Sequence, residues 1–134
     1  LALMDVVVAW VDELGYDVLF FVVNTPVRVD YHDYVAPVSR SFVLFFFFFF
    51  FFFGGSGTGE QIVANKIKGI RCCQATEPVT AALSRQHNDA NILSMGARIV
   101  GEQVAIGCVE AFLEAEFDGG RHIPRVEKIK ALET

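Results

Sequence analysis

The chain alternates between two apolar patterns along most of its length, and this alternation limits the folds open to it. Segments with apolar residues at helical spacing are followed by short runs that favour strands, with Gly, Pro or Asn between them. We predict helices at 3–14, 31–42, 60–67, 77–86, 101–115 and 124–132, and strands at 16–23, 45–53, 70–75 and 91–95. Regular alternation of this kind indicates an α/β fold with a parallel sheet and helices on both faces.

The position of a ligand site follows from this topology. In open parallel sheets the site lies beyond the carboxyl ends of the strands. We expect three loops at that edge: the loop from Pro26 to Tyr31, the glycine-rich loop at 54–59, and the turn that begins at His87. The polar residues of these loops are therefore the first candidates for chemistry.

Nine consecutive phenylalanines at 45–53 set one predicted strand apart from the others. A buried parallel strand is normally rich in Val, Ile and Leu, because helices pack closely on both of its faces. Nine rings would overfill that space, and an exposed run would promote aggregation. We therefore interpret the run as a stretch of doubtful residue identity in a chain whose other residues are about half apolar, the usual share. An intact mass matching nine phenylalanines would contradict this interpretation.

Length, charge and cysteine content narrow the class of protein. The 134 residues predict a single domain, 1–134, that can bury a core. The net charge of −5 argues against a nucleic-acid partner, and the longest apolar run, at 42–53, is too short for a membrane-spanning helix. No secretory signal is visible, and three cysteines without metal-type spacing indicate reduced thiols, so we expect a cytoplasmic protein.

A glycine-rich loop, Gly-Gly-Ser-Gly-Thr-Gly, occupies residues 54–59. Two nucleotide motifs fail here, because Glu60 stands where the P-loop has lysine and where the dinucleotide fingerprint has its third glycine. A glycine turn that leads into a helix still directs several N–H groups toward one point, where they can stabilise an oxyanion. With Ser56 and these amides on the oxygen, Glu60 could take a proton from the neighbouring carbon. An equally open alternative is that Glu60 is only a favourable acid in a first helical turn.

Histidine and its polar neighbours form a second candidate group. His87, Asn88 and Asp89 can hydrogen-bond sugar hydroxyls or move protons. Taken alone, however, they are more typical of a turn whose Asn and Asp satisfy the local backbone. His32 is expected in a turn or on the surface.

Arginines near the C-terminus form a third group. Arg121 and Arg125 are four residues apart and would share a helix face, with His122 beside them. Two guanidinium groups and a histidine suit a phosphomonoester, whereas a solvated basic face is an equally good interpretation. Arg98, which closely follows Gly96, has the same two interpretations.

Four ordered blocks of sequence make the chain recognisable. They are Gly54-Gly-Ser-Gly-Thr-Gly-Glu-Gln-Ile-Val-Ala-Asn-Lys66, Gly69-Ile-Arg71, Ser84-Arg-Gln-His-Asn-Asp-Ala-Asn91 and Gly119-Gly-Arg-His-Ile-Pro-Arg-Val126. Together they resemble ribose-5-phosphate isomerase type B, a family that also includes galactose-6-phosphate isomerase subunits. The resemblance covers residue 30 to the C-terminus apart from the phenylalanine run, and extends weakly over the first helix and strand.

This resemblance implies an aldose–ketose isomerase with a three-layer, Rossmann-like α/β sandwich. Such an enzyme interconverts ribose 5-phosphate and ribulose 5-phosphate through an enediolate, without a metal or another cofactor. The resemblance also implies a homodimer, in some members a tetramer, whose active sites lie at the subunit interface and take residues from both subunits. The expected partner is a phosphorylated sugar, with no nucleic acid and no membrane.

Roles for individual residues follow from the same resemblance. One branch of the family uses a cysteine as base where this chain has Gly54, and the branch similar to actinobacterial members carries a glutamate where Glu60 stands. Glu60 would then move the proton between C2 and C1, and His87 would open the sugar ring. Stabilisation of the enediolate would come from Ser56 and the amides around Gly57 and Gly59. The other implied substrate-binding residues are Asp30, Tyr31, Gly55 and Asn88 near the sugar, and Arg98, Arg121, His122 and Arg125 near the phosphate and adjacent oxygens.

Two departures from the family pattern leave alternatives open. The family's first strand ends in an Asp-His loop that contributes to substrate binding, and we expect that strand to precede Leu1. The phenylalanine run stands where the family has the strand that leads into the glycine loop. The alternatives are an isomerase of a six-carbon substrate, such as allose or galactose 6-phosphate, and an inactive relative that only binds sugar phosphates.

Overall fold

The computed structural model describes residues 9, 13, 35–37 and 50–133. Residues 9 and 13 are helical, within the predicted helix at 3–14, and residues 35–37 are helical within the one at 31–42. The predicted strand at 16–23, the first part of the phenylalanine run, and the candidates Asp30, Tyr31 and His32 lie outside the described residues.

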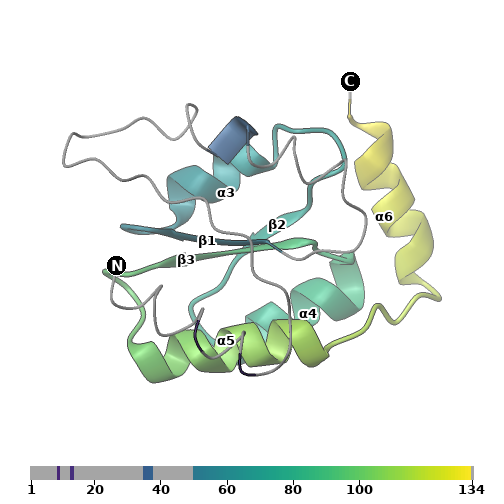
Figure 1. Cartoon of the computed structure of the whole chain (residues 1–134). Coiled ribbons are helices and arrows are strands. Elements are labelled where there is room, and N and C mark those ends of the chain that lie inside the picture. Colours follow the sequence, from purple (N-terminus) through teal and green to yellow (C-terminus); the bar gives the residue numbers. More distant parts are fainter. Residues whose placement is uncertain (1–8, 10–12, 14–34, 38–49, 134) are drawn as a thin grey trace.

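Three parallel strands form the sheet of the described region, in the order β1-β3-β2 (Figure 1). Their bounds are Phe50–Gly54 for β1, Cys72–Gln74 for β2 and Ile92–Gly96 for β3. The central strand β3 pairs with β1 along its whole length and with β2 from Ile92 to Ser94. The prediction of a parallel sheet is confirmed for these strands.

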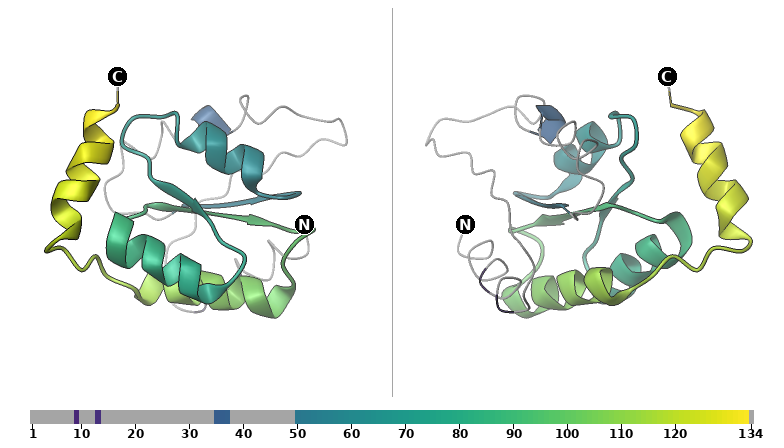
Figure 2. Two further views of the ribbon diagram at one scale, coloured as in Figure 1. Left: turned by 180° about the vertical axis from the view of Figure 1, so that it is seen from behind. Right: turned by 45° about the vertical axis from the view of Figure 1, so that its right-hand side comes forward.

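Helices cover both faces of this sheet (Figures 1 and 2). They are α3 (Thr58–Ala64), α4 (Pro78–Asn88) and α5 (Glu102–Glu114), whereas α6 (His122–Ala131) lies beyond one end of the sheet. The chain passes from β1 across β3 to β2 and then returns to β3, so right-handed connections place α3 and α4 on opposite faces. α5 lies with α4, and the three-layer α/β prediction is confirmed.

Two apolar clusters hold the layers together. The cluster on the α4 and α5 face contains fully buried Leu93, Met95 and Phe112, and Phe51 and Phe53 of β1 pack against it. The cluster on the α3 face contains Ile92 and Cys72, with Phe52 packed against it. The rings therefore alternate between faces, as a strand requires.

The described rings of the phenylalanine run are half-buried rather than fully enclosed. The ring of Phe51 lies edge-on to that of Phe112, with centroids 6.0 Å apart. Small side chains, Ala75, Ala81, Ala90 and Ala105, belong to the same cluster. Their low volume leaves space that a cluster of larger aliphatic residues would fill.

Helix α4 extends further than its sequence pattern indicates. Glu77 caps it, because its side chain accepts hydrogen bonds from the N–H groups of Val79 (2.7 Å) and Thr80 (2.8 Å). The helix continues to Asn88, and only Asp89, with φ of 48°, leaves it. The predicted turn at His87 and Asn88 is therefore wrong, since both residues belong to the last turn of α4.

Over residues 9, 13, 35–37 and 50–133, none of the helices has the length and apolar character needed to cross a membrane.

Candidate active site

The glycine loop lies where the connections of two neighbouring strands separate. β1 leads to α3 on one face of the sheet, whereas β3 leads to α5 on the other face. Ligands of parallel α/β sheets bind at the carboxyl edge beside such a switch point. The backbone N–H groups of Ala97 and Arg98 donate to the carbonyls of Gly54 (2.8 Å) and Gly55 (3.0 Å), so the two loops lie against each other.

Gly57 can adopt its place in the loop only because it has no side chain. Its φ is +82°, and a β-carbon would lie 2.8 Å from the carbonyl carbon of Met95. The carbonyl of Gly57 accepts a hydrogen bond from the buried Ser94 hydroxyl at 2.7 Å and another from the Gln61 N–H at 3.1 Å. The central strand therefore fixes the turn that leads into α3.

A side chain from β2 holds the loop from its other side. The amide Nε2 of Gln74 donates to the Ser56 carbonyl at 2.8 Å and to the Thr58 hydroxyl at 3.0 Å. The N–H of Thr58 in turn donates to Ser56 Oγ at 3.3 Å. Three strands thus position Ser56, which is half-buried at the carboxyl edge of the sheet.

Glu60 is buried beside this loop, although it is a charged residue in the first turn of α3. Only 9% of the residue is exposed, and a β-carbon on Gly54 would overlap its Oε1 atom. Its Oε2 atom is buried and has no hydrogen-bond partner among the described residues. An acid that only complements the helix dipole would be expected in water, since a buried, unpaired carboxylate oxygen costs free energy. The arrangement therefore favours a carboxylate kept for a ligand.

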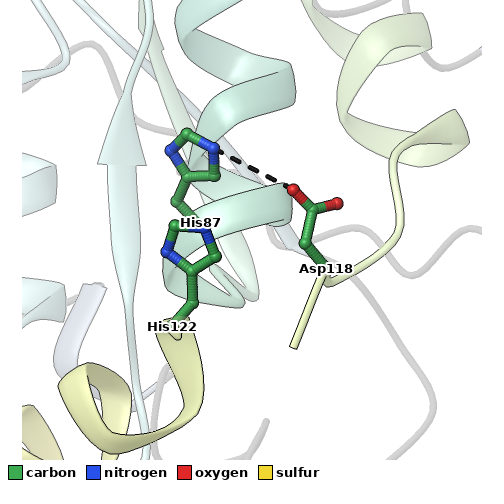
Figure 3. A group of neighbouring side chains, drawn as sticks. All are labelled: His87, Asp118 and His122. Carbon is green, nitrogen blue, oxygen red and sulfur yellow. Dashed lines mark ion pairs between the residues drawn. The ribbon is translucent and has the colours of Figure 1, made fainter. Parts of the chain in front are cut away.

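A second group of polar side chains gathers at the end of α4 (Figure 3). The imidazole rings of His87 and His122 are stacked, with centroids 4.3 Å apart and an interplanar angle of 12°. Nε2 of His87 lies 4.0 Å from Oδ2 of Asp118. The N–H of Asp118 donates to the Gln86 carbonyl at 2.9 Å, which ties this loop to α4.

The electrostatic surroundings of His122 disfavour its protonation. The residue is 7% exposed, and burial is the main cause that lowers its pKa. The nearby His87, Arg121 and Arg125 lower this pKa further, while Asp118 acts in the opposite direction. These surroundings therefore favour the neutral form of His122.

The two groups lie at opposite edges of the sheet. α4 starts after the carboxyl end of β2 and returns to the amino edge, about 16 Å away for a helix of its length. Arg71, directly before β2, donates from Nε to the Asn88 carbonyl at 3.0 Å, which places the end of α4 there. In Figure 1 the junction of β1 and α3 lies at one end of the sheet, and α6 lies at the other. The expectation that His87 lies at the carboxyl edge is wrong, because this residue precedes a strand.

The predicted site residues thus divide into two sets. The carboxyl-edge set comprises Gly55, Ser56, Gly57, Gly59, Glu60 and Arg98. The amino-edge set comprises His87, Asn88, Arg121, His122 and Arg125. Within one chain, Arg98 is therefore separated from the other arginines.

Sequence reasoning missed three residues that the structure places at these sites. Ser94 and Gln74 support the glycine loop from strands that carry no motif. Asp118 lies beside His87, and its position directly before Gly119-Gly120 was the available signal, because glycine pairs mark tight turns.

The three cysteines are unpaired thiols to which no role was assigned. All three are free, Cys72 and Cys108 being buried and Cys73 half-buried. Burial is the main cause that raises each thiol pKa, to about 11 for Cys108. The thiolate that a nucleophile requires is therefore disfavoured at neutral pH.

Comparisons with known proteins give one consistent relationship. The model of the ribose/galactose isomerase family matches residues 1–129. Ribose-5-phosphate isomerase B of Escherichia coli K12 is 40% identical over 127 residues, which cover 95% of this chain and 85% of that protein.

Solved structures agree with this relationship. Ribose-5-phosphate isomerase B of Clostridium thermocellum superposes with a TM-score of 0.92 and 37% identity, over 98% of this chain and 88% of that one. The Mycoplasma genitalium enzyme, solved with bound ribulose 5-phosphate, has a TM-score of 0.92 and 31% identity over the same shares.

Proposed function

The chain belongs to the ribose/galactose isomerase family, and from this premise we propose that it interconverts ribose 5-phosphate and ribulose 5-phosphate with Glu60 as the base. One observation carries the choice of base. The carboxylate of Glu60 is buried beside the glycine loop, and its Oε2 atom has no partner in the described part of the chain. A ligand carbon at this place would meet a carboxylate oxygen that accepts no hydrogen bond from any described residue.

The chemistry follows from this arrangement. Glu60 removes the proton from C2 of the open-chain aldose, which gives an enediolate; the hydroxyl proton passes from O2 to O1, and Glu60 returns its proton to C1. Ser56 and the amides around Gly57 and Gly59 stabilise the developing charge on oxygen. Support for this role comes from the rigid loop, because the bonds from Ser94 and Gln74 fix these donors before the charge develops.

The amino-edge set of residues suits the sugar ring, the hydroxyls and the phosphate of the substrate. His87 would open the sugar ring, and Asn88 would bind hydroxyls. Arg121 and Arg125 are exposed near His122, where their guanidinium groups can pair with a phosphate. Arg98, with Asp30 and Tyr31, completes the proposed binding residues.

A complete site in this proposal needs two copies of the chain. A five-carbon sugar phosphate is shorter than α4, so it cannot contact Glu60 and His87 of the same chain. A homodimer that brings the amino edge of one copy to the carboxyl edge of its partner supplies both. α6 supports this arrangement, because Ile123, Ile129 and Leu132 are 50%, 41% and 82% exposed and could pack on a partner.

Turnover measurements test the proposal. We expect the highest kcat/KM for ribose 5-phosphate when the purified chain is given ribose 5-phosphate, allose 6-phosphate and galactose 6-phosphate in turn. A preference for a six-carbon substrate would contradict the assignment of ribose 5-phosphate as the substrate, but it would not contradict the isomerase mechanism. Calorimetric binding of ribose 5-phosphate without turnover would contradict the isomerase activity and indicate an inactive relative.

The free cysteines support a cytoplasmic location for the protein.

A further inference from the structure

His87, Asp118 and His122 bring three potential metal ligands together at the end of α4 (Figure 3). We propose that they bind a divalent transition-metal ion such as Zn²⁺, and that this ion inhibits the enzyme. The binding stands independently of the isomerase activity, whereas the inhibition rests on the proposed function, in which His87 opens the sugar ring.

The three ligand atoms are close enough to converge on one ion. One nitrogen of each imidazole and one Asp118 oxygen all lie within 4.8 Å of one another. Zinc bonds to nitrogen and oxygen are about 2.0–2.2 Å long, so ligand atoms in a tetrahedral site lie about 3.3 Å apart. The His87 Nε2 to Asp118 Oδ2 separation of 4.0 Å needs only a small contraction.

The rings must turn slightly to complete the site. Because the imidazoles are nearly parallel, their nitrogen lone pairs lie side by side instead of meeting at one point. The side chains of His87 and Asp118 are 38% and 53% exposed, so each can rotate without disturbing the core. A bound ion would therefore replace the stack by two tilted rings, and water would occupy the fourth position.

The chemistry of the three ligands selects the class of ion. Two imidazoles and one carboxylate suit Zn²⁺, whereas Mg²⁺ prefers oxygen ligands and keeps its water. An imidazole binds a metal ion in its neutral form. Arg121 and Arg125 lie near His122 and repel a dication, so we expect micromolar rather than nanomolar affinity.

Inhibition follows from the ligand set. A metal ion on His87 occupies the nitrogen lone pair that would otherwise accept or donate a proton. The ring-opening step therefore loses its acid–base group while the ion is bound. Removal of the ion by a chelator should restore the acid–base function of His87.

Calorimetry of this chain with Zn²⁺ tests the site directly. We expect one ion per chain, binding of Co²⁺ with the visible absorption of a four- or five-coordinate ion, and no binding of Mg²⁺. Asp118→Asn should weaken Zn²⁺ binding about tenfold or more. Glu116→Gln, which removes another exposed carboxylate two residues away, is the matched control and should leave the affinity unchanged.

The isomerase assay gives the second readout. Zn²⁺ should inhibit turnover of the unaltered chain reversibly, and the concentration for half inhibition should rise about tenfold or more in Asp118→Asn. Equal Zn²⁺ affinity in Asp118→Asn, His87→Asn and the unaltered chain would overturn the site, as would no binding at millimolar Zn²⁺. A chain that binds Zn²⁺ as described but shows no isomerase activity would contradict the proposed function and support the site.

Discussion

Gly54 and Glu60 share one space at the carboxyl edge of the sheet. A β-carbon on Gly54 would overlap Oε1 of the Glu60 carboxylate, so the absence of a side chain at the end of β1 makes room for the buried acid. Any larger side chain at position 54, including the cysteine that the resemblance implies for another branch of the family, would compete with Glu60 for this space. Under the proposed function, a base at position 54 and the buried base Glu60 are therefore alternatives.

Gly54→Ala should displace the Glu60 carboxylate. We expect kcat to fall about tenfold or more and the free energy of unfolding to fall by about 1–3 kcal/mol, because the new methyl group enters filled space. Gly101→Ala is the control, since a β-carbon there meets nothing within 4 Å. Unchanged kcat in Gly54→Ala would show that the position of Glu60 does not matter for turnover.

Ser94→Ala should loosen the glycine loop. The variant loses the hydrogen bond to the Gly57 carbonyl, which should cost about 1 kcal/mol of stability and lower kcat. Ser84→Ala is matched to it, because Ser84 is also buried and donates to a carbonyl, that of Ala81 at 2.7 Å. If both variants lost equal stability and retained equal kcat, the loop would not depend on Ser94.

Two inactive variants should restore activity when their subunits exchange. Glu60→Gln and His87→Asn would each inactivate their own homodimer. In a dimer with one copy of each, one of the two sites carries both native residues if each site takes Glu60 and His87 from different chains. Random mixing of equal amounts should then recover about a quarter of the native sites. No recovery in a mixture shown by mass spectrometry to contain heterodimers would contradict the shared site.

His122 should have a pKa below the ordinary value of histidine. Burial and the neighbouring positive charges lower its pKa, so the midpoint followed by NMR should lie below about 6.5. Because the unfolded chain then binds more protons than the folded chain, this residue lowers stability as the pH falls through that value. Arg121→Gln should raise the midpoint, and a midpoint above 6.5 in the unaltered chain would contradict the assignment.

The fold could largely be predicted from the sequence, because apolar periodicity and glycine punctuation are local signals. The strand at 91–95 and the helix at 101–115 match β3 (Ile92–Gly96) and α5 (Glu102–Glu114) within a residue or so. Helix ends were less accurate, since capping decides them. α4 runs on to Asn88, because the residue that turns out of the helix is Asp89.

The candidate site was predictable only in part. The glycine loop can be predicted from its composition. The hydrogen bonds that Ser94 and Gln74 make to it depend on which strands become neighbours in the sheet. The separation of His87 from Glu60 depends on the direction in which α4 crosses the sheet. The composition of a loop does not indicate the direction of the preceding helix, so the sequence-based prediction wrongly assigns both residues to the carboxyl edge.

The most direct test of the central claim is the turnover of Glu60→Gln. Glutamine keeps the size of the side chain and removes the carboxylate, so kcat on ribose 5-phosphate should fall about 10²–10⁴-fold while binding of the substrate phosphate is spared. Glu102→Gln, which removes the exposed first-turn acid of α5, should retain full turnover. Near-native kcat in Glu60→Gln would contradict the assignment of Glu60 as the base.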